Sequence, residues 1–249
     1  MRIGIDITAL PANPVGAGTY TIELVRALIE LGPQHQWVIF AQPNGRKLLA
    51  LPDHPADKDH PADTNHPPVQ WVIVAEKPPL LRLLWEQTVF PFLVKQARLD
   101  VLHSLHYTRP VFLPCASVVT FHDMTFFLFP KLHTLSKRIF FPPAIRLSAR
   151  LADALIAVSE STRKDAIRLL GIPEHKIHTA PNGVSSAYQP ILDQESRQFC
   201  KNKYNLPDKF ILFVGTIEPR KNLPVLLKAY HHLVKNAPTL MFTNAGMNQ

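Results

Sequence analysis

Short apolar runs alternate with stretches of helical periodicity along most of this chain. The apolar runs are five to seven residues long, which is strand length, and polar or glycine-containing segments separate them. Such alternation predicts an α/β fold, with a mostly parallel, Rossmann-like sheet and helices on both of its faces. We predict strands over Arg2–Thr8, Trp37–Ala41, Val69–Ala75, Asp100–Ser104, Ser117–Phe121, Ala154–Val158 and Lys176–Ala180.

The segments between these strands carry apolar residues at helical spacing. Pro91 predicts a break in one helix, and the pair Pro142-Pro143 predicts an interruption of another. Ser159 is a favourable N-cap for a further helix, and Gly171 is a stop for it. Helices are expected over Thr19–Leu31, Leu80–Ala97, Leu135–Leu151 and the segment between Ser159 and Gly171.

A second series of strand and helix begins near the end of the chain. Phe210–Val214 is an apolar run of strand length, a helix starts near Leu223, and Leu240–Thr243 is a further strand. The predicted organisation is an N-terminal domain over 1–183, a linker over 184–208, and the start of an incomplete second Rossmann-like domain over 209–249.

One low-complexity insert, residues 51–68, interrupts the first domain. The pentapeptide DHPAD occurs twice in it, and a third His-Pro pair follows. With their aspartates, His54, His60 and His66 suggest a metal site, but alternating prolines exclude the regular structure that would fix ligand geometry. We therefore expect a disordered surface loop.

Composition narrows the classes of partner. The 249 residues are 46% hydrophobic, enough for a full core, and the net charge of +8 favours anionic partners. Nothing resembles a nucleic-acid-binding module, so nucleic acid ranks last. Two cysteines make neither a disulfide framework nor a metal cluster and fit a reducing cytoplasm. No signal peptide is expected, because the chain starts with a strand, and no apolar run is long enough to cross a bilayer.

Candidate chemistry gathers where the predicted strands end, because ligands of open parallel sheets bind there. Gly16 and Gly18 would allow the backbone to approach a phosphate closely, but a tight turn needs the same backbone freedom. His122, which precedes Asp123, could bind a sugar hydroxyl through its imidazole. The alternative is a structural histidine held by a neighbouring carboxylate. The candidates at these strand ends are Gly16, Gly18, His103, His106, His122 and Asp123.

The loop before the last helix carries Arg220 and Lys221. Two adjacent cations and the free N–H groups of a helix start supply positive potential at one place, which suits a diphosphate. An ordinary strand–helix unit with a solvated basic loop is the alternative.

Three segments resemble glycosyltransferase family 4, a family with the GT-B fold that uses nucleotide sugars. They are GTIEPRKN with the L-x-x-L-L-x-A-Y helix that follows, VVTFHDMTFFLFP, and LADALIAVSESTRKDAIRLLGIPEHKIHTAPNGV. The resemblance covers nearly the whole chain. It implies two Rossmann-like domains and a retaining hexosyltransferase that needs no metal or cofactor and takes a GDP- or UDP-linked sugar as its donor substrate.

The same resemblance implies roles for single residues. His122 would lie beside the donor sugar, and Asp123 would hold the loop that carries it. Arg220 and Lys221 would stabilise the departing diphosphate. GTIEPRKN resembles mannosyltransferase-like members, which implies mannose as the sugar and a glycan or lipid-linked acceptor. The implied site comprises catalytic His122 and Asp123 with donor-diphosphate-binding Arg220, Lys221, Gly16 and Gly18.

Two departures from the family pattern bear on activity. Thr216 stands where many relatives have arginine, and the E-x7-E motif that grips the donor would lie beyond Gln249. We therefore expect a fragment or a truncated chain. The alternative function is a non-catalytic remnant that binds an acceptor glycan or a partner chain. A nucleotide-sugar epimerase is a third hypothesis, against which the T-x-H-D and P-R-K-N segments argue.

Two helical segments are candidates for contact with a membrane surface, Leu80–Arg98 and Leu135–Arg150. Both mix bulky apolar residues with arginine and lysine, as interfacial helices do. The alternative is that they pack on the sheet with basic outer faces. We expect a cytoplasmic chain, with peripheral association at the inner face of the membrane as a hypothesis.

Overall fold

A computed structural model describes residues 1–51, 69–185, 188–215, 217, 219–233 and 238–243. The insert predicted to be disordered lies, apart from Leu51, outside the described residues. The chain divides into two compact units, Met1–Gly183 and Val184–Gln249, called here the first and second units. Each is described by itself.

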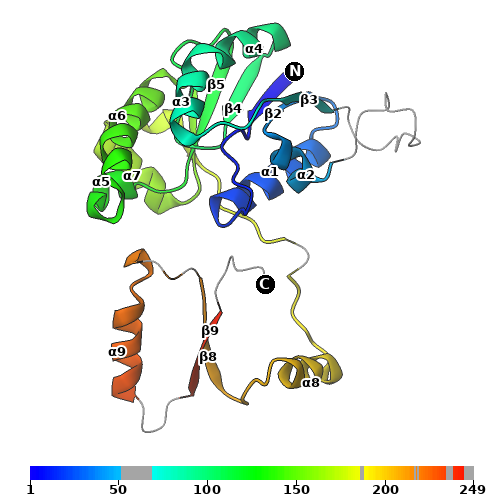
Figure 1. Ribbon diagram of the computed structural model, residues 1–249, viewed down its shortest axis with the longest axis vertical. Coiled ribbons are helices and arrows are strands. Elements are labelled where there is room, and N and C mark those ends of the chain that lie inside the picture. The colour runs from blue at the N-terminus through cyan, green and yellow to red at the C-terminus, as the bar shows by residue number, and fades with distance from the viewer. Residues whose placement is uncertain (52–68, 186–187, 216, 218, 234–237, 244–249) are drawn as a thin grey trace, which may run out of the picture. The chain divides into compact units, whose positions relative to one another are not determined.

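The first unit is built on a seven-stranded sheet in the order β3-β2-β1-β4-β5-β6-β7 (Figure 1). Every pair of neighbouring strands is parallel. The predicted α/β fold is therefore confirmed, and the strand positions agree to within two residues at each end. The strands are β1 (Arg2–Asp6), β2 (Gln36–Ala41), β3 (Val69–Ile73), β4 (Val101–Ser104), β5 (Ala116–Phe121), β6 (Ala154–Ala157) and β7 (Ile177–Thr179).

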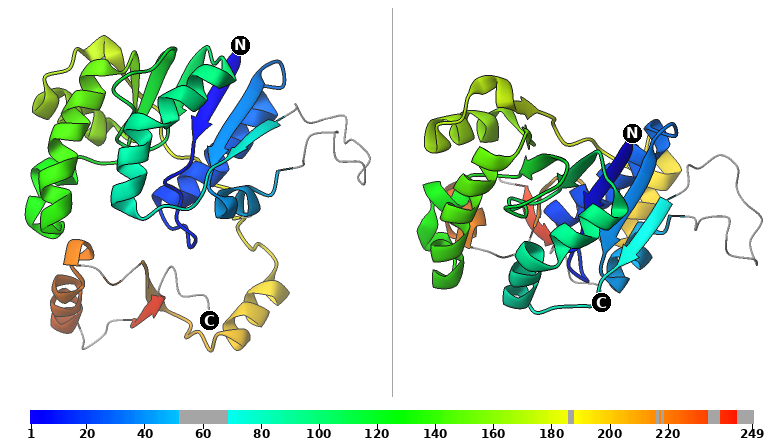
Figure 2. Two further views of the ribbon diagram at one scale, coloured as in Figure 1. Left: turned by 45° about the horizontal axis from the view of Figure 1, so that its top comes forward. Right: turned by 90° about the horizontal axis from the view of Figure 1, so that it is seen from above.

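The two faces of the sheet are covered by different helices (Figure 2). Strand β2 shows this most directly, since alternate side chains enter different core clusters. Trp37 and Ile39 pack with α1 (Ala17–Leu31) and α2 (Pro43–Leu49). Val38 and Phe40 pack on the other face, where the helices are α3 (Pro79–Thr88) and α4 (Phe90–Ala97).

The β5–β6 half of the sheet has its own core cluster. Val119 and Leu155 pack there with residues of α6 (Leu135–Leu151) and α7 (Glu160–Leu170). Val119 pairs with Ser104 of β4, and Ser104 shares a face of the sheet with Leu102, because alternate residues of a strand point to the same side. Leu102 packs with residues of α3 and α4, so this cluster lies on the same face as those helices. The short elements α5 (Thr125–Leu128), η1 (Pro130–Leu132) and η2 (Glu174–Lys176) complete the first unit.

Local signals predicted helix ends better than helix interruptions. Ser159 caps α7, because its Oγ accepts the N–H of Thr162 at 3.1 Å, and Gly171 ends it at a φ of 64°. The break near Pro91 is confirmed, since α3 and α4 meet at Val89.

The predicted interruption of α6 at Pro142-Pro143 is wrong, because both prolines lie inside one continuous helix. Proline removes the N–H that would bond the carbonyl four residues earlier. Those carbonyls belong to Arg138 and Ile139, which are both exposed, so water can satisfy them. The helix therefore continues through the pair.

The second unit has a parallel pair of strands, β8 (Phe210–Val214) and β9 (Thr239–Thr243). Between them lie η3 (Pro219–Lys221) and α9 (Leu223–Leu233), and α8 (Gln194–Lys203) precedes them. None of the residues that the structure describes in this unit is buried. Its strands and helix follow the predicted pattern without enclosing a core.

Candidate active site

A small pocket opens at the carboxyl edge of the sheet in the first unit. Its volume is about 120 Å³, and it lies between the ends of β1, β4 and β5 and the first turn of α1. Edges of this kind are the usual ligand sites of open parallel sheets. The residues that line it include Asp6, Leu10, Gly18, Thr21, His106 and His122.

His122 is half-buried on the wall of this pocket. Its Nε2–H donates to the carbonyl of Leu105 at 2.9 Å, which leaves Nδ1 as the acceptor of the ring. Tyr20 of α1 meets the imidazole edge-on, with ring centroids 5.0 Å apart. Burial lowers the pKa of His122, although the bond to Leu105 acts the other way. A neutral imidazole held in this way can accept a hydrogen bond from a sugar hydroxyl.

Asp123 turns away from the pocket and holds the loop after β5. Its Oδ1 accepts the backbone N–H of Thr125 at 2.9 Å and the Thr125 hydroxyl at 2.6 Å. Its own N–H donates to Tyr107 Oη at 3.1 Å. Asp123 is absent from the described residues that line the pocket, so it fixes the start of α5 and the position of its neighbour His122.

The two glycines of the first loop serve different geometric needs. Gly16 has a φ of 52° just before α1, a backbone conformation that favours glycine. Gly18 lines the pocket with His122, and a Cβ there would lie 2.6 Å from Cβ of Pro14. The structure therefore brings Gly18 and His122 together, and close packing against Pro14 already explains why position 18 has no side chain.

Two further polar residues, Asp6 and His106, line the pocket, and Glu86 lies next to His106. Asp6 and Glu86 are both buried and face His106, with Nε2 lying 4.0 Å from Asp6 Oδ2 and 3.7 Å from Glu86 Oε2. Glu86 also accepts hydrogen bonds from Arg82 at 3.0 Å and from the Thr108 hydroxyl at 3.3 Å. The only sequence signal is an acidic residue inside an otherwise apolar strand or helix.

Opposing effects act on the pKa of the buried Glu86 carboxyl. Burial acts to raise the pKa of Glu86, but His106, Arg82 and the Thr108 hydroxyl together lower it below its usual value. Glu86 therefore stays ionised, with its Oε2 lying 3.7 Å from Nε2 of His106. Within the described residues, no group of His, Cys, Asp and Glu has an arrangement that would hold a metal ion.

His103 serves the core instead of the pocket. Its Nε2 lies 2.9 Å from the Thr120 hydroxyl on the neighbouring strand, and the side chain is buried. Desolvation lowers its pKa to about 4, so the imidazole is neutral at neutral pH. Among the strand-end candidates, His103 is therefore a structural histidine.

The predicted diphosphate-binding pair lies in the second unit. Arg220 and Lys221 form part of η3, directly before α9, and Lys221 is exposed. Asn222, with a φ of 52°, joins η3 to the helix and accepts the N–H groups of Val225 and Leu226 through its carbonyl. The pair is thus placed at a helix start, as the sequence predicted.

Comparison with known proteins identifies the class of this chain. The model of Glycosyltransferase Family 4 matches residues 14–188, which include the pocket residues Gly18, His106 and His122. The match covers well over half of the chain. The chain therefore belongs to Glycosyltransferase Family 4.

The curated relatives are considerably longer than the regions they share with this chain. The O-antigen chain mannosyltransferase B of Escherichia coli is 33% identical over 134 residues, which are 53% of this chain and 35% of that protein. The serotype-specific mannosyltransferase WbdA of Escherichia coli is 38% identical over 80 residues, which are 32% of this chain and 10% of that protein.

Solved structures match the fold over nearly all of the chain. The Anabaena protein Alr3699/HepE, crystallised with UDP-glucose, has a TM-score of 0.61 at 18% identity. The match covers 98% of this chain and 60% of that one. The α/β fold with its parallel sheet is therefore that of GT-B glycosyltransferases.

Proposed function

We propose that this chain carries the acceptor-side part of a retaining hexosyltransferase, which moves mannose from a GDP- or UDP-linked donor to a glycan or lipid-linked acceptor. The pocket at the carboxyl edge of the sheet is the observation that carries this proposal. It places the neutral imidazole of His122 beside Gly18 in a chain of Glycosyltransferase Family 4. A volume of about 120 Å³ suits one edge of a sugar ring and is too small for a whole ligand.

The chemistry of the reaction explains the two groups of residues. Negative charge grows on the departing nucleoside diphosphate as the glycosyl bond breaks, and cations already in place lower that barrier. In the proposal Arg220 and Lys221 of η3 supply these cations, and His122 binds a sugar hydroxyl. No metal or cofactor is assigned a role.

The identity of the sugar and of the acceptor rests on the relatives. Both curated relatives in Escherichia coli are mannosyltransferases, which supports mannose. The first acts on the O-antigen chain by its name, which supports a polysaccharide acceptor. The Anabaena structure holds UDP-glucose, so the nucleotide base stays open between guanine and uracil.

Transfer of radiolabelled mannose from GDP-mannose or UDP-mannose to a mannose-terminated oligosaccharide tests the proposal in an enzyme that joins this chain to a complete donor-side domain. We expect transfer from one donor and none by the Lys221→Ala variant, because the diphosphate loses a charge-assisted contact. Lys228→Ala is the matched control, since Lys228 is an exposed cation elsewhere on α9. Near-normal turnover by Lys221→Ala would contradict its role, and the anomeric configuration of the product, read by NMR, tests retention.

A second candidate is a chain that binds an acceptor glycan or a partner chain without transferring sugar. The observation that favours it is the contrast between the first unit, which has a core and a pocket, and the second unit, none of whose described residues is buried. Acceptor binding without transfer from any nucleotide sugar would support this candidate over the first.

We also propose that the chain acts in the cytoplasm, peripherally at the inner face of the membrane. Within the described part of the chain, no helix is long and apolar enough to cross a membrane. The helices α3, α4 and α6 contain one acidic residue, Glu86, and that residue is fully buried. Their outer surface mixes exposed apolar residues with cations, which suits anionic lipid. The exposed apolar residues there include Leu81, Leu84, Phe92, Leu135 and Ile139.

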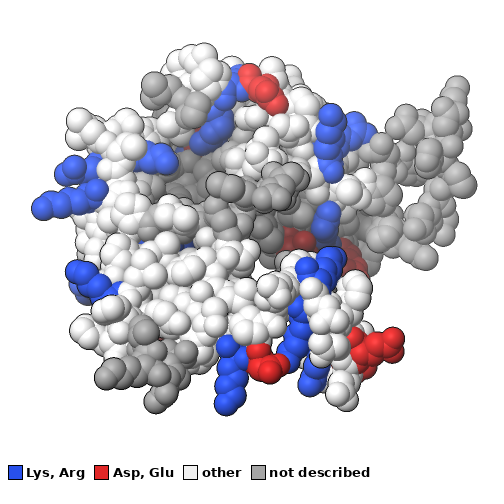
Figure 3. Space-filling view, turned by 60° about the horizontal axis from the view of Figure 1, so that its bottom comes forward, with Lys and Arg blue, Asp and Glu red and all other residues white. Residues whose placement is uncertain are grey.

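Charge is not confined to that surface. Figure 3 shows Lys and Arg spread among uncharged residues over another view of the molecule, with Asp and Glu less frequent. The apolar component is therefore the better test. In flotation with anionic vesicles, Ile139→Glu is expected to lose binding, whereas Leu31→Glu on α1 keeps it because Leu31 lies on the opposite face of the sheet. Equal loss by both variants would contradict a specific face.

A further inference from the structure

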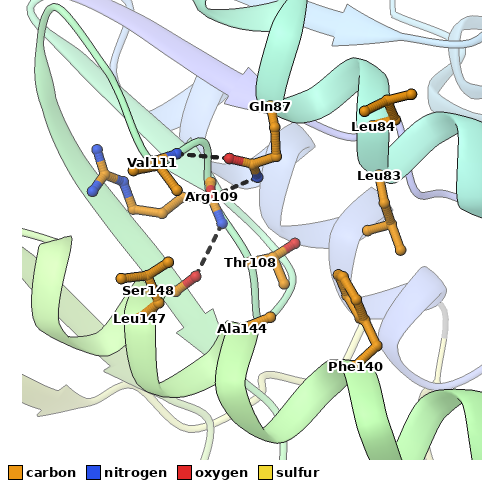
Figure 4. Close-up of a pocket in the computed structure, with 10 residues that line it drawn as sticks. All are labelled: Leu83, Leu84, Gln87, Thr108, Arg109, Val111, Phe140, Ala144, Leu147 and Ser148. Atoms are coloured by element: carbon orange, nitrogen blue, oxygen red, sulfur yellow. Dashed lines mark hydrogen bonds between the residues drawn. The ribbon is translucent and has the colours of Figure 1, made fainter.

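A pair of cavities runs along the surface between α3, α4 and α6. The first, of about 430 Å³, lies between α3 and α6 and is lined mainly by apolar side chains (Figure 4). The second, of about 620 Å³, is lined by residues of α4 and of the segment before β5. Arg109 and Val111 line both cavities, so the two adjoin at this segment, and together they are called the groove here.

The segment that separates the two cavities is held rigidly. Gln87 of α3 donates to the carbonyl of Arg109 at 3.2 Å and accepts the N–H of Val111 at 2.9 Å. From the other side, the N–H of Arg109 donates to the Ser148 hydroxyl of α6 at 3.3 Å. These bonds, drawn in Figure 4, fix the backbone of Arg109 between the two helices.

The side chain of Arg109 is the unusual feature of this groove. Its exposed fraction is 7%, and its Nε has no hydrogen-bond partner among the described residues. In Figure 4 the guanidinium points away from Leu83, Leu84 and Phe140, and the residue also lines the second cavity. A buried guanidinium normally has its donors satisfied, so this one is available to an anionic ligand.

The charges around the second cavity favour an anion beside Arg109. Lys95 of α4 lines the same cavity and adds a second cation. Asp153 is the acidic residue there, and its Oδ2 already accepts the N–H of Ser117 at 2.7 Å and the Ser117 hydroxyl at 3.1 Å. Burial lowers the pKa of Arg109 and the charge of Asp153 opposes this, so an additional anion would stabilise the charged guanidinium.

We propose that this groove binds a membrane lipid with one long apolar chain on a phosphate group. The chain lies in the cavity between α3 and α6, and the phosphate binds Arg109 and Lys95. Burial of the chain supplies most of the binding free energy, and the guanidinium charge recognises the phosphate. The exposed apolar surface around the groove, which includes Phe92 and Phe112, is suited to contact with the membrane that delivers the lipid.

This proposal rests on the lipid-linked branch of the proposed acceptor, but its test needs no donor sugar. Binding of farnesyl phosphate to the purified 249-residue chain is measured by calorimetry, at concentrations below that at which the lipid aggregates. Farnesol and inorganic phosphate serve as probes of each half of the ligand. We expect saturable binding of farnesyl phosphate, binding of farnesol that is weaker by about tenfold or more, and no binding of inorganic phosphate.

Three variants separate the groove from general effects. Arg109→Gln is expected to weaken farnesyl phosphate binding about tenfold or more while leaving farnesol unchanged. Ala144→Phe fills the apolar cavity and is expected to weaken both, which keeps the proposal testable if the buried Arg109 variant does not fold. Arg146→Gln removes an exposed cation of α6 that lines neither cavity, and it is expected to bind normally.

Equal affinity for farnesol and farnesyl phosphate would overturn the proposal, because the phosphate would then play no part. So would strong binding of inorganic phosphate alone, or unchanged binding by Ala144→Phe. Loss of sugar transfer with lipid binding intact would count against the proposed function alone. Transfer to a water-soluble glycan with no lipid binding would count against the groove alone.

Discussion

The two units of this chain follow the same strand–helix pattern, yet they bury very different amounts of apolar surface. In the first unit each face of β2 is covered, and Phe40 and Ile39 are fully buried. In the second unit β8 has the equally apolar sequence FILFV, but Leu212 is 52% exposed. A parallel strand is therefore stabilised by neighbours on both faces more than by its own composition.

The largest effect expected from this contrast is a difference in amide hydrogen exchange between β2 and β8. Amides of β2 should exchange only when the first unit unfolds, whereas those of β8 exchange through local opening. We expect exchange at Val38 and Ile39 to be about a thousandfold or more slower than at Ile211 and Leu212, since this corresponds to ~4 kcal/mol of opening free energy. Exchange followed residue by residue in NMR spectra measures this, and similar protection in both strands would remove the contrast.

Truncating one phenylalanine in each unit sharpens the comparison. Phe40→Ala should destabilise the first unit by about 3–5 kcal/mol, because Phe40 is fully buried and packs edge-on against Phe90. Phe213→Ala should cost about 1 kcal/mol or less, since Phe213 is only partly buried.

The chain offers a convenient probe for this measurement. All three tryptophans, Trp37, Trp71 and Trp85, lie in the first unit, so their fluorescence follows the unfolding of that unit by denaturant. A shift of this transition by Phe213→Ala as large as that by Phe40→Ala would show that the two units unfold together.

Acid is expected to destabilise the first unit through His103. Its pKa is about 4 in the folded chain against the ordinary value of 6.5, so the unfolded state binds more protons between these values. The contribution of His103 to the free energy of unfolding is fully present above pH 6.5. It falls by about 3 kcal/mol as the pH drops toward 4. Tryptophan-monitored unfolding at several pH values measures the slope.

Substitution identifies the group responsible for that slope. His103→Gln keeps a hydrogen-bonding side chain beside Thr120 without a titrating ring, so the slope between pH 6.5 and 4 should become shallower. His175→Gln, at an exposed position in the same unit, should leave it unchanged. An unchanged slope in His103→Gln would assign the effect to other groups.

The smallest expected effect concerns one helix cap in each unit. Ser159→Ala should cost the first unit about 1 kcal/mol, because the N–H of Thr162 loses its acceptor. Asp193 caps α8 in the second unit in the same way, accepting the N–H of Ser196 at 2.6 Å. Asp193→Ala should therefore leave the tryptophan transition unchanged, and a shift in it would indicate coupling between the units.

Much of the fold could be predicted because the signals that specify it are local. Apolar runs located every strand of the first sheet, and the Ser159 cap and Gly171 stop fixed α7. The proline pair in α6 was misleading, because the cost of a missing N–H depends on whether water reaches the freed carbonyl. That exposure is a tertiary property.

The candidate site divides in the same way. His122 could be found from its place directly after a strand, and the structure sets it in the pocket. Asp6 and Glu86 were missed, because an acidic residue within an apolar segment gives no indication of its partner. The groove beside Arg109 was also missed, since its walls come from α3, α4, α6 and the segment before β5.

The sequence by itself determined the strands of the first sheet, most of the helices and the parallel arrangement, because the spacing of apolar residues reports local burial directly. The family resemblance, which the comparisons confirmed, came from the motif segments instead. Only the tertiary structure decided which polar residues share a pocket, that Gly18 packs against Pro14, and that Arg109 is buried without a partner for its Nε among the described residues. Such contacts join residues far apart in the chain, and their energies depend on distance and burial, which periodicity does not encode.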